Sequence, residues 1–414
     1  MIKLNDEVFQ ISKDPDFTRG EYQSRHQKAR DLMEKQNLNA LFILEETNLT
    51  YFSGFRKIIP YGSKSRTYML HFFILPIDED PVLILPLEMR GNAEYMTWVE
   101  DVQFFYDNDP VDLVIQTFNE LKLTKGIIGC ELGDRTRLDC SWNDFEAIRL
   151  GLPKAKLIDA APLNWELRTV KSAAEIEYLQ KACDMSQIAL RAGFEVAHIG
   201  MTEKELFTEI AKAALDEGAG DLPIKIDYVV VSGPERHLLY DTRPSNKKFR
   251  KGDIVIVDGG VAYKSYWCDF TRLACIGTPN QKQKDMYETA LDALIVALST
   301  VKAGVTISNV KGAADELFRE RGYEENNLDT SCGHGVGLEI HEPPSISRLN
   351  ETLLNSGNVL AIEPMIYATA TIKYMQEGIA KGERTCDFFL EDNIVVTSNG
   401  FQNLTPMDRE LWII

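Results

Sequence analysis

The chain has 414 residues, of which 44% are hydrophobic and 26% charged, which is typical of a globular protein of two or three domains. Its formal net charge of -18 argues against nucleic acids and anionic membranes as partners, because both call for clustered Lys and Arg. We expect no secretory signal and no membrane span, because the apolar runs are too short. Seven cysteines without a CxxC pair predict reduced thiols and a cytoplasmic protein.

The first part of the chain alternates between two kinds of pattern. Mixed-charge or amphipathic patterns typical of helices cover residues 20–36 and 109–123. Apolar runs typical of buried strands lie at 40–46, 69–77, 81–87 and 126–131. This alternation predicts an α/β domain over residues 1–165.

The remainder predicts a second domain over 166–414. Two S/T-x-x-E capping boxes predict the starts of two helices, and they pair Ser172 with Glu175 and Thr202 with Glu205. Strands are expected at 226–233, 253–277, 358–367 and 388–400, and further helices at about 282–303 and 307–321. Helices beside an antiparallel sheet give this domain α+β character.

The segment "SCGHGVGLEIHEPP" at 331–344 holds His334 and His341, seven positions apart. Seven residues on a helix would put both on one face, but three glycines and two prolines argue against a helix. On a strand, an odd separation would send the two rings to opposite faces. Neither element makes them joint ligands by itself, so the partners of a site must come from elsewhere in the chain.

Several carboxylates stand in strongly apolar segments, where an ionised carboxylate is costly unless it is paired or metal-bound. They are Asp258, Asp269, Glu363, Glu391 and Asp392. A capping or turn role would explain any one of them, but converging like charges need a cation. These five residues fall in four strand segments, since Glu391 and Asp392 are adjacent. One carboxylate from each segment, together with one glycine-flanked histidine, suits Mn, Co or Zn. Two adjacent ions would clamp a carbonyl group and lower the pKa of bound water.

These motifs, in this order, resemble the pita-bread metallohydrolases, which include methionine aminopeptidase, prolidase, aminopeptidase P and creatinase. "VDGGVAYKSYWCDFTR" is similar to their paired-aspartate hairpin, and "GHGVGLEIHEPP" and "AIEPMIY" to their histidine and first-glutamate motifs. "LEDNIVVTSNGFQNLT" is similar to their second-glutamate strand. The resemblance covers about 168–405 as ordered motifs. It implies an α+β protein, with a pita-bread catalytic domain preceded by an α/β creatinase-like N-terminal domain.

The resemblance implies two divalent metal ions, with Mn, Co and Zn as the candidates. The implied ligands are Asp258, Asp269, His334, Glu363 and Glu391. Asp269 and Glu391 would bridge both ions and Asp258 would bind one of them. His334 and Glu363 would bind the other.

Two further roles follow from the resemblance. Glu363 would also carry the proton of the attacking hydroxide as a general base. His341 would contact the substrate and the developing oxyanion, and its alternative is a structural hydrogen bond. A substrate-contacting histidine upstream of the hairpin has no direct counterpart here, so His237 or Tyr240 is the candidate for its place.

A second departure concerns the substrate anchor. Prolidases usually place an arginine two residues before the second glutamate, where this chain has Phe389. Phe389 is therefore a candidate substrate contact, with side-chain packing as the alternative. Arg56, Tyr61 and Arg66, in an aromatic and basic segment, are candidates to supply the missing anchor, against the alternative of an ordinary surface loop.

The sequence thus predicts a dinuclear metallohydrolase that cleaves Xaa-Pro peptides, as a dipeptidase or aminopeptidase, by a metal-activated hydroxide. The alternative is a non-peptide hydrolase or lyase like creatinase, ectoine hydrolase or dimethylsulfoniopropionate lyase, which the altered loop and Phe389 favour. A catalytically silent binding protein is disfavoured, because all five ligands are present. The resemblance also implies a homodimer.

Overall fold

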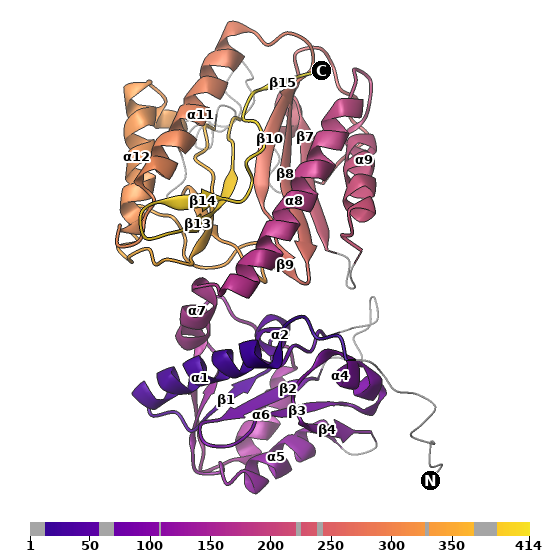
Figure 1. Cartoon of the computed structure of the whole chain (residues 1–414), viewed down its shortest axis with the longest axis vertical. Coiled ribbons are helices and arrows are strands. Elements are labelled where there is room, and N and C mark those ends of the chain that lie inside the picture. The colour runs from indigo at the N-terminus through magenta and orange to yellow at the C-terminus, as the bar shows by residue number, and fades with distance from the viewer. Residues whose placement is uncertain are drawn as a thin grey trace. The chain divides into compact units, whose positions relative to one another are not determined.

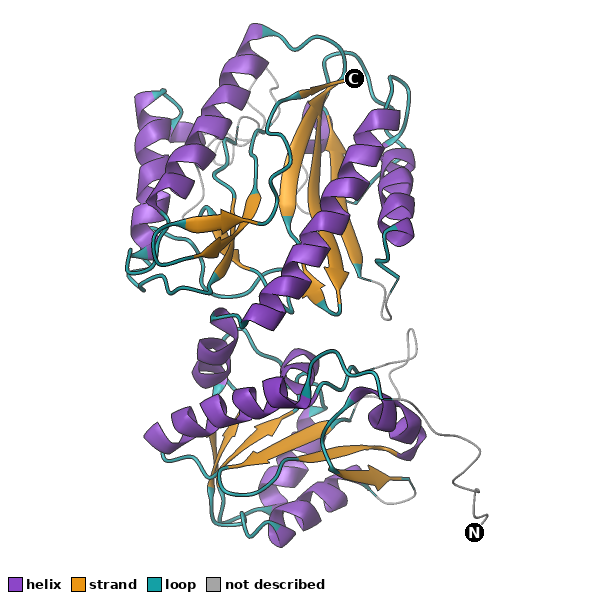
Figure 2. Ribbon diagram, viewed as in Figure 1, coloured by secondary structure: helices purple, strands orange, loops and turns teal. Residues whose placement is uncertain are grey.

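The computed structural model describes residues 13–57, 70–106, 109–220, 225–237, 243–327, 331–367 and 387–414. The chain divides into two compact units, Met1–Arg168 and Thr169–Ile414 (Figure 1). Each unit combines helices and strands around a hydrophobic core of its own (Figure 2). Within the described residues, no helix is both long enough and apolar enough to cross a membrane.

The first unit is built around a mixed six-stranded sheet with the order β4-β3-β2-β1-β5-β6. β2 runs antiparallel to both neighbours, whereas the β3–β4, β1–β5 and β5–β6 pairs are parallel. The strands are β1 (Ala40–Ile43), β2 (Phe72–Pro76), β3 (Val82–Pro86), β4 (Asp101–Phe105), β5 (Ile127–Cys130) and β6 (Lys156–Asp159). The helices are α1 (Arg19–Lys35), α2 (Glu46–Ser53), η1 (Leu87–Met89), α4 (Arg90–Met96), α5 (Pro110–Glu120), α6 (Trp142–Gly151) and α7 (Ala161–Thr169).

The strands predicted from apolar runs are confirmed as β1, β2, β3 and β5, and the two predicted helices as α1 and α5. β4 and β6 were not predicted from the sequence. Both lie at the edges of the sheet, where Asp101, Lys156 and Asp159 are exposed. An edge strand with polar ends has no continuous apolar run, so its pattern resembles that of a loop.

Successive residues of β2 show how helices cover both faces of this sheet. Phe72 stacks on Phe42 at 5.7 Å between ring centroids, and Phe42 meets Phe118 of α5 at 5.3 Å. The next residue, Phe73, points to the opposite face and stacks on Phe52 of α2 at 5.9 Å. A sheet that is buried on both sides has uniformly apolar strands, and this is why the runs were visible in the sequence.

The second unit contains two sheets. One has the order β15-β10-β8-β7 with β9 paired to β8, and the other has the order β11-β12-β13-β14. The strands are β7 (Ile226–Ser232), β8 (Ile254–Tyr263), β9 (Tyr266–Trp267), β10 (Phe270–Cys275), β11 (Gly333–Gly335), β12 (Val359–Ile362), β13 (Asp392–Val396), β14 (Phe401–Asn403) and β15 (Trp412–Ile413). The helices are α8 (Ala173–Val196), α9 (Glu203–Asp216), α10 (Pro234–His237), α11 (Gln281–Thr300), α12 (Ile307–Glu320) and η2 (Glu324–Asn326).

Both predicted capping boxes are confirmed. The Ser172 hydroxyl accepts from the Glu175 backbone N–H while the Glu175 carboxylate accepts from the Ser172 N–H, and α8 begins there. Thr202 and Glu205 make the same reciprocal pair at the start of α9. Each box satisfies N–H groups that have no partner within the helix, so these two starts are decided locally.

One hydrophobic core holds the two sheets of this unit together. It includes Leu294 of α11 and Val310 of α12, and it reaches Ile256 of β8, Leu360 of β12 and Ile394 of β13. The two sheets therefore share one core with α11 and α12, while α8 packs on β8 (Figure 1). Residues at the junction of the two sheets are therefore fixed by packing against both sheets and against these helices.

A buried histidine of the first unit makes its stability depend on pH. His26 of α1 is 8% exposed, and its Nε2 lies 2.7 Å from the carbonyl oxygen of Phe52. Burial lowers the pKa of His26 to about 4. Because an unfolded histidine titrates near pH 6.5, the stability present above that pH is lost as the pH falls towards 4.

Protonation of His26 in the unfolded chain should lower the free energy of unfolding by about 2 kcal/mol as the pH falls from 7 to 5. Urea unfolding at the two pH values, for the unaltered chain and for His26→Phe, measures this contribution. The substitution should flatten the pH dependence by that amount. An unchanged pH dependence in His26→Phe would show that His26 is not responsible.

Candidate metal centre

The two sheets of the second unit bring together the five predicted ligand residues. In the first sheet, Asp258 lies on β8 and Asp269 directly precedes β10. In the second sheet, His334 lies on β11, Glu363 directly follows β12, and Glu391 directly precedes β13. Strand pairing within each sheet and the shared core place these five residues at one junction.

The side chains approach closely enough to share ions. Nε2 of His334 lies 3.5 Å from Oδ2 of Asp269, 3.6 Å from Oε1 of Glu363 and 3.9 Å from Oε1 of Glu391. Three groups have ligand atoms within 4.8 Å of one another: Asp258, Asp269 and Glu391; His334, Glu363 and Glu391; and Asp269, His334 and His341. Asp269, His334 and Glu391 each belong to two of these groups.

Two glycines allow neighbouring backbone to approach the ligand strands. Gly259 follows the ligand residue of β8 with φ 117°, and Gly333 precedes that of β11 with φ 144°. A Cβ atom would lie 2.2 Å from the carbonyl oxygen of Asp227 at the first position, and 2.1 Å from that of Ala361 at the second. A side chain at either position would displace the adjacent strand, so both positions require glycine.

Burial and mutual repulsion both act on the carboxylates of the cluster. Burial raises the pKa of Asp258, and it raises the pKa of Asp269 and of Glu391 well above their ordinary values. The charges of Asp258 and Glu363 raise the pKa of both Asp269 and Glu391 further. A divalent cation would oppose these shifts, because it stabilises the charged form of every carboxylate around it.

Two details of the donor atoms fit metal binding. Oε1 of Glu391 is buried and accepts no hydrogen bond within the described part of the chain. Nδ1 of His334 lies 3.0 Å from the carbonyl oxygen of Gly335, so we assign the ring proton to Nδ1. Nε2 then presents its lone pair to the carboxylates. The residues present therefore fit divalent ions that take oxygen and imidazole ligands.

Thr271 joins candidate ligands of the two sheets, and it was not among the site residues predicted from the sequence. Its hydroxyl oxygen lies 2.5 Å from Oδ1 of Asp258 and 3.0 Å from Oε2 of Glu391. A hydroxyl has one hydrogen, so it donates to one carboxylate at a time. Its position two residues after Asp269 is a signal that was available, because alternate residues of an extended chain point to the same side.

His341 lies beside His334, although neither a helix nor a strand joins them. β11 ends at Gly335, and the chain then folds back, so the two ring centroids are 4.3 Å apart. Nε2 of His341 lies 3.9 Å from Oδ2 of Asp269. The His341 side chain is 69% exposed and that of His334 is 11% exposed. The two histidines therefore share one site, one buried and one at its rim.

The structure places His237 away from this cluster. Its Nδ1 accepts from the backbone N–H of Asp387 at 3.0 Å, and burial lowers its pKa to about 4. The turn that carries His237 is bonded to the beginning of β8 through Gly233, whose N–H donates to the carbonyl oxygen of Ile254 at 3.0 Å. Ile254 lies four residues, or about 13 Å, before Asp258 along β8. This position does not support a substrate contact by His237 at the ligand cluster. Tyr240 lies outside the described residues.

Of the remaining predicted substrate contacts, Phe389 and Arg56 lie within the described residues. Phe389 is 5% exposed and belongs to the core of the second unit, so it packs as a core residue. In the first unit, Arg56 is 9% exposed and forms an ion pair with Asp16 at 3.6 Å. Tyr61 and Arg66 lie outside the described residues.

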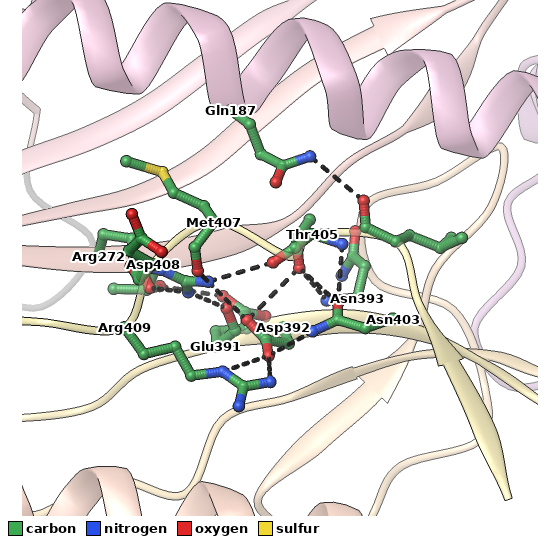
Figure 3. Close-up of polar contacts among 12 residues, drawn as sticks. Gln187, Arg272, Glu391, Asp392, Asn393, Asn403, Thr405, Met407, Asp408 and Arg409 are labelled. Carbon is green, nitrogen blue, oxygen red and sulfur yellow. Dashed lines mark hydrogen bonds and ion pairs between the residues drawn. The ribbon is translucent and has the colours of Figure 1, made fainter.

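A buried ion pair lies behind Glu391 (Figure 3). Arg272 and Asp392 have fully buried side chains, and Nη2 of Arg272 lies 2.8 Å from Oδ1 of Asp392. Nη1 of Arg272 also donates to the carbonyl oxygens of Thr271, at 2.9 Å, and of Glu391, at 2.8 Å. Arg272 thus ties β10 of one sheet to the start of β13 in the other, next to the ligands.

Asp392 has further partners on the same side. Its Oδ2 accepts from Nδ2 of Asn403 at 3.0 Å and from Nε of Arg409 at 2.8 Å, and Nη2 of Arg409 also contacts it. Two cations and an amide therefore surround this carboxylate. Asp392 was among the carboxylates noted in the sequence, but it points away from the ligand cluster because it is adjacent to Glu391 in extended chain.

Comparison with known proteins supports one family for the whole chain. Residues 177–398 match the profile of metallopeptidase family M24, and residues 25–170 match the creatinase/prolidase N-terminal domain. The chain is 30% identical over 381 residues to a Xaa-Pro dipeptidase of Pyrococcus horikoshii, covering 92% of this chain and 96% of that protein.

Solved structures show the same fold. A prolidase from Thermococcus sibiricus is 26% identical with a TM-score of 0.80, covering 95% of this chain and 99% of that one. An X-Pro aminopeptidase from Thermotoga maritima is 28% identical with a TM-score of 0.78, covering 94% and 99%. These matches confirm the predicted α+β fold, with its creatinase-like and pita-bread parts. The chain belongs to metallopeptidase family M24.

Proposed function

We propose that this metallohydrolase holds two divalent ions and cleaves Xaa-Pro peptides as a dipeptidase or aminopeptidase. The observation that supports the metal centre is the overlap of the candidate ligand groups, in which Asp269, His334 and Glu391 each take part twice. The peptide substrate is supported by relatives named Xaa-Pro dipeptidase, prolidase and X-Pro aminopeptidase, which align over more than 90% of the chain. These relatives disfavour the non-peptide alternative.

We assign the ions, with Mn, Co or Zn as candidates, to Asp258, Asp269, His334, Glu363 and Glu391. Asp269 and Glu391 would be common to both ions, because each belongs to two groups and a carboxylate offers two oxygens. His334 also belongs to two groups, but its imidazole offers a single lone pair. Bound ions would supply Lewis acidity, which polarises a carbonyl group and lowers the pKa of water. We also propose a homodimer in the cytoplasm. Substrate contacts by Arg56, Tyr61, Arg66 and Tyr240 stay predictions.

Glu363 is suited to carry a proton during hydrolysis. Its side chain is 25% exposed, compared with 7% for Asp269 and 1% for Glu391. A general base must reach both the attacking water and the leaving nitrogen, and this requires access from the open side of the site. Glu363 would accept a proton from water and return it to the leaving amine.

His341 is suited to bind the reacting peptide. Its exposed ring lies at the rim of the ligand cluster, within 3.9 Å of Asp269. A ring N–H at this position would donate to the carbonyl oxygen as negative charge develops on it. We therefore assign His341 to oxyanion stabilisation.

The His341 loop is anchored by a buried ion pair. Nζ of Lys171 lies 3.0 Å from Oε2 of Glu342, and the two side chains are 2% and 1% exposed. The Glu342 backbone N–H and C=O both pair with Gly335 at the end of β11, at 2.7 and 2.8 Å. Because Glu342 directly follows His341, this anchor sets where the imidazole lies.

The proposed function is tested by metal analysis together with turnover of Xaa-Pro dipeptides, longer Xaa-Pro peptides and matched Xaa-Ala peptides. Two bound ions and selective cleavage of Xaa-Pro bonds are expected. Two bound ions without any Xaa-Pro cleavage would refute the substrate. If the protein contains no metal after purification in the presence of Mn or Co, the ligand assignment is refuted.

Replacing Glu363 with Gln should lower kcat by about 10²- to 10⁴-fold, because the amide cannot accept the proton. Steady-state kinetics on an Xaa-Pro dipeptide measure the loss, and circular dichroism verifies the fold. Glu351→Gln, at an exposed glutamate of the same unit, is the control and should keep full activity. If kcat is unaltered in Glu363→Gln, the assignment of Glu363 as the proton carrier is wrong.

Replacing Lys171 with Met should lower the free energy of unfolding by about 3–5 kcal/mol, because Glu342 is left as an uncompensated buried carboxylate. Urea unfolding measures this change. Lys181→Met is the matched control, since Lys181 pairs with Glu177 at 3.3 Å on the exposed surface, and about 1 kcal/mol or less is expected. Equal effects of the two substitutions would contradict the anchoring role of the buried pair.

A further inference from the structure

We propose that the Asn393 carboxamide is a positioning group that sets the backbone of Asp269 and thereby the affinity and geometry of the metal centre. This inference rests on the metal-binding part of the proposed function. It concerns a residue that is not a ligand and does not face the substrate. Asn393 instead acts through the ligand Asp269, which belongs to two of the three ligand groups.

The side chain of Asn393 pairs with both backbone groups of Asp269. Its Nδ2 donates to the carbonyl oxygen of Asp269 at 2.5 Å, and its Oδ1 accepts from the backbone N–H of Asp269 at 2.9 Å. These two bonds run in opposite directions, as they do between paired strands. The amide therefore holds one residue of backbone in both position and orientation.

Asp269 needs this support because it lies between two strands. β9 ends at Trp267 and β10 begins at Phe270. The pairing of β9 with β8 ends at Trp267, and the pairing of β10 with β8 begins at Phe270. Asp269 thus lies outside both ladders, and Asn393 supplies the partner that a neighbouring strand would otherwise provide.

Asn393 itself is held firmly. It is fully buried on β13, and its backbone N–H donates to Oγ1 of Thr405 at 3.0 Å (Figure 3). Its carbonyl oxygen accepts from the N–H of Leu404 at 2.8 Å. Sγ of Cys183 on α8 donates to Oδ1 at 3.5 Å, which supports the assignment of the amide oxygen.

The same short stretch of chain therefore serves both sheets. Glu391 presents its carboxylate to the cluster, and Asn393, two residues later, holds Asp269. The residue between them, Asp392, is pinned by Arg272 and Arg409. The separation between the carboxylates of Asp269 and Glu391 is consequently set by residues 391–393 acting as one rigid piece.

Removing the carboxamide would leave a buried N–H and a buried C=O of Asp269 without their partner. The backbone would then shift to find others, and the carboxylate would move with it. Outer partners of metal ligands typically change metal affinity by roughly 10- to 100-fold. We expect a loss of that size in the affinity for Co²⁺.

Two substitutions separate the lost hydrogen bonds from the lost volume. Asn393→Ala removes both bonds and leaves a cavity, whereas Asn393→Leu removes both bonds and keeps the volume. Asn358 is a matched control, because it is 4% exposed and its amide also joins two backbone groups. Nδ2 of Asn358 donates to the carbonyl oxygen of Thr169 at 2.8 Å, and its Oδ1 accepts from the N–H of Asn355 at 2.7 Å.

The experiment titrates the full-length chain and its variants with Co²⁺ against a competing chelator. It also records the visible absorption of bound Co²⁺ and the urea unfolding of each metal-free protein. Both Asn393 variants should lose roughly 10- to 100-fold in affinity and show shifted Co²⁺ absorption bands. The variants Asn358→Ala and Asn358→Leu should be destabilised but retain both metal properties.

Three outcomes would overturn the proposal. In the first, both Asn393 variants bind Co²⁺ within twofold of the unaltered chain and with the same bands. In the second, the Asn358 variants lose as much affinity, so that lower stability explains the effect. In the third, only Asn393→Ala is affected, which assigns the effect to the cavity. Failure of the unaltered chain to bind Co²⁺ would instead overturn the proposed metal centre, and this proposal with it.

Discussion

The arrangement of the second unit depends on one constraint: several carboxylates that repel one another are buried where its two sheets meet. Asp269 raises the pKa of Glu391, and Asp258 and Glu363 raise the pKa of both. Uncompensated charge in such a place costs several kcal/mol per group. The fold therefore needs compensation on two sides: a cation among the ligands, and a frame that keeps the carboxylates from moving apart.

The frame is built from residues that alternate with the ligands along extended chain. Glu391 points to the cluster, while its neighbour Asp392 points to Arg272 and Arg409 (Figure 3). On β10, Thr271 touches two ligand carboxylates, while its neighbour Arg272 binds carbonyl oxygens of both sheets. Because side chains alternate along extended chain, one side of each strand faces the candidate ligand cluster and the other side makes the contacts that hold the strand in place.

Much of the fold and the whole set of ligand candidates could be predicted because the responsible signals are local. The Ser172–Glu175 box satisfies its own helix end, and strands β1 and β2, which contain Phe42 and Phe73, are apolar on every residue. Asp258 and Glu391 attract notice because a carboxylate in an apolar strand demands an explanation. The edge strands β4 and β6 escaped because solvent, and not a core, covers part of their surface.

The supporting residues could not be predicted in this way, because an asparagine or threonine in a strand has many bland explanations. Asn393 and Thr271 acquire their meaning only when β13 of one sheet lies against β10 of the other, more than a hundred residues away. The same is true of Lys171 and Glu342, whose side chains meet across 171 positions of sequence.

The sequence by itself indicated which residues are the candidate metal ligands, because residue type and apolar surroundings can both be read from the local sequence. Only the tertiary structure decided that His341 lies beside His334 at the rim, since a loop held by long-range contacts brings the two rings together. The tertiary structure also places Phe389 in the core and His237 next to the beginning of β8. Distances between segments depend on how sheets pack, and no local pattern records that packing.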